Sequence, residues 1–280
     1  MKKAICLLFA CALCSVFALT ACSSNASSSS SASSNASSSS AASTGAEVTQ
    51  ADIEKMIVGT WVTADRDGKP ELTNDKVVFN FVSDTKAYVA AQFEVIPGNP
   101  LTWAKALEAD VAISGNKVTI TDHPSENSTA VSEFTVSAIS PDELTANHKL
   151  TLTVDGAEPA SMEGVCRYVK VDANYEKSIL GTWESHSASD GEKDYRCEYK
   201  ADGTYVFYEK NGDEWVVIGD TLDEYYVSGN LLCERWVNNG QENRESWEIS
   251  IDGDTMTRTA LRQGDDGKTF TESRELKKVA

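Results

Sequence analysis

An internal repeat constrains the fold of this 280-residue chain more than any other feature. Residues 52–61 read Asp-Ile-Glu-Lys-Met-Ile-Val-Gly-Thr-Trp, and residues 174–183 read Asn-Tyr-Glu-Lys-Ser-Ile-Leu-Gly-Thr-Trp. The two copies also end alike, with Arg-Tyr-Val-Lys at 167–170 and Arg-Glu-Leu-Lys at 274–277. Copies of this length are large enough to hold separate cores. The repeat therefore predicts two related domains, 51–171 and 173–280.

Within each copy, apolar residues recur with period two, which is the spacing of a half-buried strand. In the second copy Tyr195, Cys197 and Tyr199 alternate with charged residues, and Gly- and Asn-containing turns separate such runs. About eight short strands per copy, joined by sequential hairpins, favour an up-and-down barrel, because closure removes exposed edges. The expected fold class is all-β, with two tandem small antiparallel up-and-down β-barrels. Only 101–113 is compatible with either a helix or a strand.

The N-terminal segment has the composition of an export signal. Lys2 and Lys3 precede 18 uncharged, mostly apolar residues, so 1–21 is predicted to be a signal peptide. The run ends in Leu-Thr-Ala-Cys22, which resembles the lipobox of bacterial lipoproteins and implies a diacylglycerol anchor on the Cys22 thiol. The alternatives are a plain secretory signal and an uncleaved membrane helix, although 18 residues are marginal for a span. The resemblance places the protein in the bacterial cell envelope, facing the extracytoplasmic side.

A serine tract separates the signal from the first copy. Residues 23–44 contain 14 Ser in 22 positions and no apolar side chain larger than that of Ala. Such a segment cannot bury enough surface to fold. We therefore expect 22–46 to be a lipidated, disordered tether.

The charge of the chain excludes one class of partner. The net charge is −18, and loss of Lys2 and Lys3 with the signal leaves 23 basic against 43 acidic residues, a net charge of −20. Affinity for nucleic acid depends on clustered Lys and Arg that neutralise phosphates. A nucleic-acid partner is therefore excluded, and the expected contact with the membrane is through the lipid anchor alone.

The residues that usually carry catalysis or hold metals are sparse. The chain has three histidines, His123, His148 and His186, and no two of them stand at a metal-ligand spacing. Phosphate-binding loops and nucleophile elbows are absent from the sequence. We therefore expect no enzymatic activity, no metal and no cofactor. Cys197 and Cys233 are compatible with a disulfide or with two buried free thiols.

Aromatic residues are distributed unevenly between the copies, with 8 in the first and 13 in the second. Ordinary core packing explains many of them, because aromatic side chains suit strands. A ligand pocket in the second barrel is the functional interpretation, since apolar walls with a few polar groups are typical of small-molecule sites. The candidate ligand-binding residues are Tyr205, Phe207, Trp215, Tyr225, Tyr226, Trp236 and Trp247.

Each copy combines a short N-terminal turn, a Gly-x-Trp motif opening the first strand, a meander of strands and a late Arg. This pattern resembles the lipocalin-like (calycin-type) domains of bacterial lipoproteins. The resemblance implies that a late Arg packs over the Trp ring where the barrel closes. The residues that it assigns to barrel closure are Gly59, Trp61 and Arg167 in the first copy, and Gly181, Trp183 and Arg274 in the second.

The resemblance also implies a function for the chain. The expected function is non-enzymatic binding of a small, partly apolar ligand inside a barrel, chiefly the second. The alternative is a structural or partner-binding envelope module whose barrels are filled by their own side chains.

Overall fold

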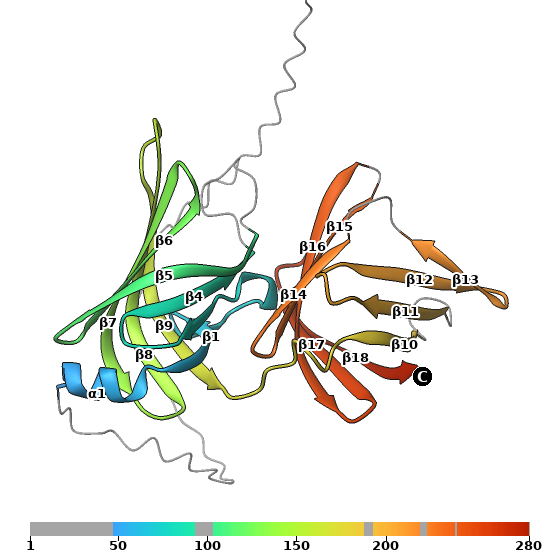
Figure 1. Ribbon diagram of the computed structural model, residues 1–280, viewed down its shortest axis with the longest axis horizontal. Coiled ribbons are helices and arrows are strands. Elements are labelled where there is room, and N and C mark those ends of the chain that lie inside the picture. Colours follow the sequence, from blue (N-terminus) through green and yellow to red (C-terminus); the bar gives the residue numbers. More distant parts are fainter. Residues whose placement is uncertain (1–46, 93–102, 188–192, 219–222, 239, 280) are drawn as a thin grey trace, which may run out of the picture. The chain divides into compact units, whose positions relative to one another are not determined.

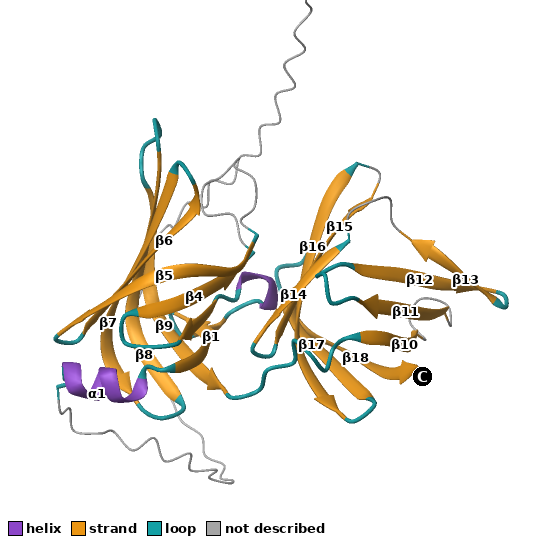
Figure 2. Ribbon diagram, viewed as in Figure 1, coloured by secondary structure: helices purple, strands orange, loops and turns teal. Residues whose placement is uncertain are grey.

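The computed structural model describes residues 47–92, 103–187, 193–218, 223–238 and 240–279. The predicted signal peptide, Cys22 and the serine tract lie outside these residues. The described part of the chain is built almost entirely from strands (Figures 1 and 2), which confirms the all-β prediction. It contains no helix with the length and apolar character that a membrane crossing requires.

The first sheet follows a short helix and includes one 3-10 turn. Its elements are α1 (Gln50–Met56), β1 (Gly59–Arg66), β2 (Lys69–Pro70), η1 (Thr73–Asp75), β3 (Val78–Phe81), β4 (Lys86–Ala91), β5 (Ala104–Ser114), β6 (Lys117–Ser125), β7 (Ser128–Ile139), β8 (Glu143–Val154) and β9 (Ala160–Val171). The stretch 101–113 is compatible with a helix or a strand by sequence, and its residues 104–113 belong to the strand β5.

The first sheet closes on itself. Consecutive strands pair antiparallel from β3 to β9, and β1 pairs with β3 on one side and with β9 on the other. Across the closing pair, Trp61 lies opposite Lys170. The two-residue β2 extends β1 and does not enter the ring. The first copy is therefore a closed antiparallel barrel of eight strands, as predicted.

The helix α1 contributes to the core of the first barrel. Thr49 and Asp52 form a capping box in which the Thr49 backbone donates to the Asp52 carboxylate over 3.0 Å. The helix places Ile53 and Ile57 against the barrel interior, where both are fully buried. Burial of an apolar stripe of this kind stabilises a helix that is too short to be stable alone.

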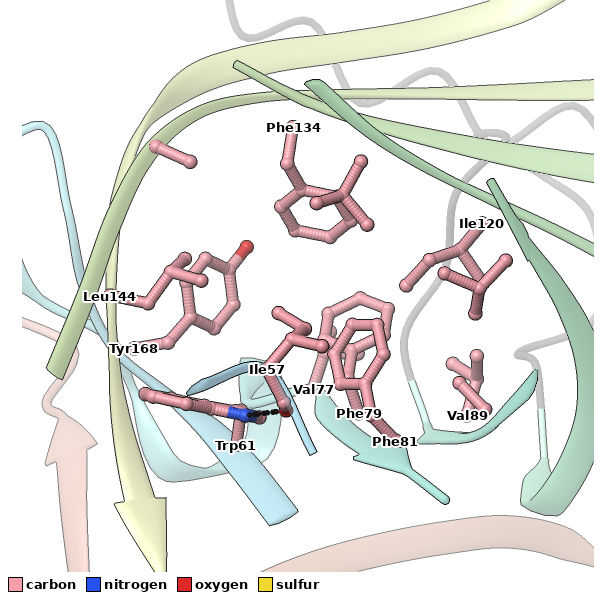
Figure 3. Close-up of a cluster of buried hydrophobic side chains, with 14 of the residues drawn as sticks. Ile57, Trp61, Val77, Phe79, Phe81, Val89, Ile120, Phe134, Leu144 and Tyr168 are labelled. Atoms are coloured by element: carbon pink, nitrogen blue, oxygen red, sulfur yellow. Dashed lines mark hydrogen bonds between the residues drawn. The ribbon is translucent and has the colours of Figure 1, made fainter. Parts of the chain in front are cut away.

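Aromatic rings occupy the interior of the first barrel (Figure 3). The ring of Phe79 meets that of Phe134 edge-on at 5.2 Å, and Phe134 stacks on His148 at 4.3 Å between ring centroids. The hydroxyl of Tyr168 is hydrogen-bonded to His148 Nδ1 at 2.7 Å. Phe134 and His148 alternate with exposed residues along β7 and β8, and the rings of Phe79 and Tyr168 contact them, so all four face the same core.

The second sheet has nine strands. They are β10 (Gly181–Ser187), β11 (Lys193–Tyr199), β12 (Tyr205–Asn211), β13 (Glu214–Ile218), β14 (Glu224–Ser228), β15 (Leu231–Asn238), β16 (Gln241–Asp252), β17 (Thr255–Gln263) and β18 (Thr269–Val279). Their order is β13-β12-β11-β10-β18-β17-β16-β15-β14, with every neighbouring pair antiparallel.

The prediction of a closed barrel for the second copy is wrong. Strands β13 and β14 are the two edges of an open sheet, and in the described residues β12 meets β14 only through an isolated bridge between Thr204 and Glu224. The reason lies in the hairpin at Asn211, because β13 pairs with β12 from Phe207 to Asn211. That hairpin occupies most of the edge of β12 that closure would need, so only its first residues are left to meet β14.

The turn η1 of the first sheet bonds to two strands of the second. Thr73 Oγ1 accepts a hydrogen bond from the backbone N–H of Leu261 at 2.8 Å. Asn74 Oδ1 accepts from the backbone N–H of Ser246 at 2.8 Å and from Arg262 Nη1 at 2.7 Å. Backbone donors of the second sheet are thus satisfied by side chains of the first.

Candidate functional site

The inner face of the second sheet surrounds a cavity of about 230 Å³. Strands β11 to β13 and β15 to β18 contribute to its wall, so residues far apart in the sequence meet there. The lining combines aromatic rings, aliphatic groups and charged side chains. Its residues are Cys197, Tyr205, Phe207, Ile218, Asp223, Glu234, Trp236, Asn238, Glu245, Arg258 and Arg274.

Charged residues stand in pairs on this inner face. Glu234 on β15 lies directly opposite Glu245 on β16, and Arg258 on β17 lies directly opposite Arg274 on β18. Like charges in directly opposed positions destabilise a sheet unless other groups compensate them. The two acidic residues are on adjacent strands, and the two arginines are on the next two strands, so each pair can compensate the other.

The pair Glu234 and Arg258 is almost fully enclosed, with 4% and 5% of the two residues exposed. Both terminal nitrogens of Arg258 lie 3.4 Å from the Glu234 carboxylate. The hydroxyl of Tyr199 donates to the same carboxylate and also accepts from Arg258. Burial, together with the neighbouring Glu245, raises the pKa of Glu234 to about 8. Burial also lowers the pKa of Arg258.

The indole ring of Trp247 packs against three arginine side chains. Its ring centroid lies 4.6 Å from the guanidinium carbon of Arg262, 5.2 Å from that of Arg274 and 6.0 Å from that of Arg258. Its ring nitrogen donates to Glu245 Oε2 at 3.1 Å, and Glu245 Oε1 forms an ion pair with Arg262 at 3.0 Å. Cation–π contacts and ion pairs together hold these side chains in place.

Two polar atoms in the cavity wall lack partners. Asp223 Oδ1 and Arg258 Nε are buried and form no hydrogen bond with any described residue. Burial raises the pKa of Asp223, because it disfavours the charged carboxylate. Buried polar atoms without partners are costly in free energy, and they indicate a missing bonding group.

The structure separates the seven aromatic residues that the sequence singles out. Tyr205, Phe207 and Trp236 line the cavity. Trp247 lies on the same inner face, fully buried beside the arginines. Tyr225 also faces inward, where its ring contacts that of Tyr199.

The other two aromatic residues lie away from the cavity. Tyr226 is on the opposite face of β14, where its ring meets that of Trp103 at 4.8 Å. Trp215 is on β13 and lies under Arg196 at 4.2 Å and Lys210 at 5.7 Å, outside the lining residues. A motif of two adjacent tyrosines cannot place both rings on one face of a strand.

Sequence reasoning gave no role to the charged residues of the cavity, apart from Arg274, which it assigned to barrel closure. A signal for them exists in the strand alternation. Glu234 shares its parity with the buried Leu232, and Arg258 shares its parity with the buried Met256 and Ala260. A charged residue at a core position of a strand is a candidate functional residue, because its burial is costly.

The two copies share one structural device at the start of the first strand. In each copy the Trp ring nitrogen donates to a backbone carbonyl over 2.6 Å, from Trp61 to Ile57 and from Trp183 to Ile179. A lysine covers each ring, with Lys170 Nζ 5.2 Å from the Trp61 centroid and Lys278 Nζ 5.1 Å from the Trp183 centroid.

The glycine two positions before each Trp allows this lysine to approach. Gly59 has φ of +131° and Gly181 has φ of +112°, which disfavour any residue with a side chain. A Cβ at Gly59 would lie 2.3 Å from Lys170 Cε, and one at Gly181 would lie 3.2 Å from Lys278 Cε. The backbone conformation therefore favours glycine at both positions, and the end of a lysine side chain lies in the space that a Cβ would take.

The prediction that arginines cover these rings requires correction. Arg167 points away from Trp61 and pairs with Asp65 and Glu143, because it alternates with the buried Tyr168 on β9. Arg274 faces inward, but it lies over Trp247, because Lys278 is the residue opposite Trp183. The residues that correspond at the ends of the two copies are therefore Lys170 and Lys278. An alignment on Arg167 and Arg274 would match Lys170 with Lys277, which is shifted by one residue.

The described cysteines are free thiols. Cys166, Cys197 and Cys233 are all buried and unbridged, so the two-thiol alternative holds for Cys197 and Cys233. Burial raises the pKa of Cys197 to about 12, which disfavours the reactive thiolate. Cys22, the predicted lipidation site, lies outside the described residues.

Comparisons with known proteins do not assign the chain to a family. No family model matches it, and no curated protein matches it either. The described residues contain no group of three His, Cys, Asp or Glu side chains that could hold a metal ion.

Proposed function

We propose that the chain is a non-enzymatic binding protein of the bacterial cell envelope that holds a small, partly apolar molecule in the cavity of its second sheet. The observation that carries this proposal is the cavity of about 230 Å³, whose wall joins aromatic rings to buried charged groups. Small-molecule sites combine apolar walls with a few placed polar groups in this way.

The energetics of the cavity support a binding role. Enclosing an ion pair such as Glu234 and Arg258 costs desolvation free energy that apolar residues would not require. A void in a core also loses packing contacts. A sheet selected for stability alone would fill this space with apolar side chains, so the hollow, charged interior favours a function that uses it.

The first barrel fits the structural alternative instead. A cavity of about 50 Å³ lies along its interior, which leaves little room for a ligand among the aromatic rings. We propose that this filled barrel supports the second sheet, which it contacts through η1.

The lipocalin-like assignment belongs to the same proposal. It is supported by the closed eight-strand barrel, by the Gly-x-Trp motif at the start of β1 and by the repetition of the lysine-covered Trp in the second sheet. The open edge of the second sheet departs from that pattern.

Native mass spectrometry of the protein purified from its host tests the binding role. We expect a bound small-molecule mass on the wild-type chain and its loss in Asn238→Trp, because the new ring would occupy the cavity at a lining position. Val217→Trp is the matched control, since Val217 is 55% exposed on β13 and does not line the cavity. A clean apo mass for the wild-type chain would contradict the proposal.

The proposed lipid anchor has a separate test. Substitution Cys22→Ala removes the thiol that would carry diacylglycerol, so we expect the protein to move from the membrane fraction to the soluble fraction. Substitution Cys166→Ala, at a buried cysteine of β9, is the control and should leave fractionation unchanged. Unchanged fractionation of Cys22→Ala would contradict a lipid anchor.

A further inference from the structure

The unpartnered atoms of the cavity are of opposite kinds. Asp223 Oδ1 is a hydrogen-bond acceptor on an acidic group, and Arg258 Nε is a donor on a basic group. Both residues line the same cavity. A ligand that carried only a cation would leave Arg258 Nε unsatisfied, and one that carried only an anion would leave Asp223 unsatisfied.

The other charged groups near the cavity have partners. Glu234 pairs with Arg258 through the terminal nitrogens, and Glu245 pairs with Arg262. Arg274 pairs with Glu272 at 2.7 Å. Among the described lining residues, the buried side-chain polar atoms without a hydrogen bond are therefore one acceptor and one donor.

The cavity wall carries charged residues of both signs. The acidic lining residues are Asp223, Glu234 and Glu245, and the basic ones are Arg258 and Arg274.

The size and the remaining lining of the cavity limit the ligand further. A volume of about 230 Å³ is smaller than the roughly 300–1,000 Å³ of pockets that hold drug-sized molecules. Phe207, Ile218 and Trp236 supply an apolar part of the wall. These features favour a small ligand that brings a donor for Asp223, an acceptor for Arg258 and an apolar group.

We propose that the second sheet binds a free α-amino acid with an apolar side chain. Its ammonium donates to Asp223 Oδ1, its carboxylate accepts from Arg258 Nε, and its side chain lies against Phe207, Ile218 and Trp236. This assignment rests on the proposed binding function and adds the chemical class of the ligand.

Calorimetric titration of the full chain at pH 7 tests the class. The probes are L-valine, L-leucine, L-methionine and L-phenylalanine, followed by two analogues of the tightest binder, the amine without the carboxylate and the acid without the ammonium. We expect each analogue to bind roughly ten- to a hundred-fold more weakly, because each leaves one buried polar group unpaired. An analogue that binds as tightly as its parent amino acid would overturn the proposal.

The variant Asp223→Asn separates the two ends of the ligand. It should weaken binding of the amino acid and the amine roughly ten-fold and leave binding of the acid analogue unchanged, since only the ammonium is expected to contact this residue. Asp213→Asn, in an exposed turn, is the control and should change none of the affinities. Equal weakening of all three probes by Asp223→Asn would contradict the assigned orientation.

Failure of this class and failure of the binding function give different results. If no amino acid binds while native mass spectrometry shows a host molecule that Asn238→Trp removes, the amino-acid class is wrong and the binding function stands. If no amino acid binds and the host-purified protein is free of ligand, both proposals are wrong.

Discussion

In the first barrel the interior is occupied by the rings of Phe79, Phe134 and Tyr168, whereas the inner face of the second sheet carries Glu234 and Arg258 beside a cavity of about 230 Å³. Both halves nevertheless begin with the same lysine-covered Trp. The comparison shows that the repeat conserves the start of the sheet, while the residues of the later strands decide whether the interior is filled or hollow.

The pairing of strand edges explains why the first sheet closes and the second does not. In the first barrel β1 has β3 and β9 as its two neighbours, so each long strand pairs on both sides. In the second sheet the β12–β13 hairpin occupies the edge that would pair with β14.

The largest effect is expected from breaking the buried ion pair of the second sheet. Above pH 8, where Glu234 is ionised, Arg258→Leu leaves this carboxylate enclosed without its partner and should lower the free energy of unfolding by about 3–5 kcal/mol. Hydrogen–deuterium exchange followed by mass spectrometry should locate the loss of protection in β15–β18, with β3–β9 unaffected. The double variant Arg258→Leu/Glu234→Leu is the control and should recover most of the loss. A single variant as stable as the wild-type protein would show that the pair is not enclosed.

Truncation of a phenylalanine should destabilise the first interior more than the second. Phe134, which is 4% exposed, should cost about 3–5 kcal/mol when replaced by Ala, because it leaves a void in a filled core. Phe207 is half-buried and already borders a cavity, so Phe207→Ala should cost only about 1–2 kcal/mol. Urea denaturation, with hydrogen exchange to assign each loss to its sheet, measures both values. Equal costs would mean that the second interior is packed as tightly as the first.

The pH dependence of stability should also separate the halves. Glu234 keeps its proton up to a pKa of about 8 in the folded protein but only to its ordinary 4.5 when unfolded. The folded state therefore holds the extra proton, and the second sheet should lose about 1–2 kcal/mol as the pH rises from 6.5 to 8.

The first barrel should be nearly constant over the same interval. The pKa of Asp122 is raised by burial to about 6, and that of His148 is lowered by burial to about 3, so in the folded protein both groups titrate below pH 6.5. Unfolded chains protonate His148 near its ordinary pKa of 6.5, so deprotonation there adds only about 0.4 kcal/mol of stability up to pH 8. Glu234→Gln should abolish the decline in the second sheet, and Asp213→Asn should leave it in place. Thermal unfolding, with hydrogen exchange read separately in each sheet, checks this slope. An unchanged decline in Glu234→Gln would contradict the assignment to Glu234.

The sequence predicts the strand content, the number of copies and the closed first barrel, because period-two alternation and turn residues are local signals. It does not predict the open second sheet, since strand alternation says nothing about which edge a hairpin occupies. The resemblance assigns the contact with the Trp ring to a late Arg, and the repeat alone leaves the register of the last strand free by one residue. That shift of one residue reverses the face to which a side chain points.

The cavity could be predicted only in part for the same physical reason. Tyr205, Phe207 and Trp236 stand out by residue type and do line it. Asp223 and Arg258 meet only through the pairing of strands that are distant in sequence, and a single charged residue in a strand gives no indication of its partner.

A crystal structure of the protein purified from its host, with no ligand added, tests the contrast between the two interiors most directly. We predict density for a small ordered molecule between Asp223 and Arg258 in the second sheet, and none inside the first barrel. Side chains packed across the second interior, with no space and no bound molecule, would contradict the proposed function.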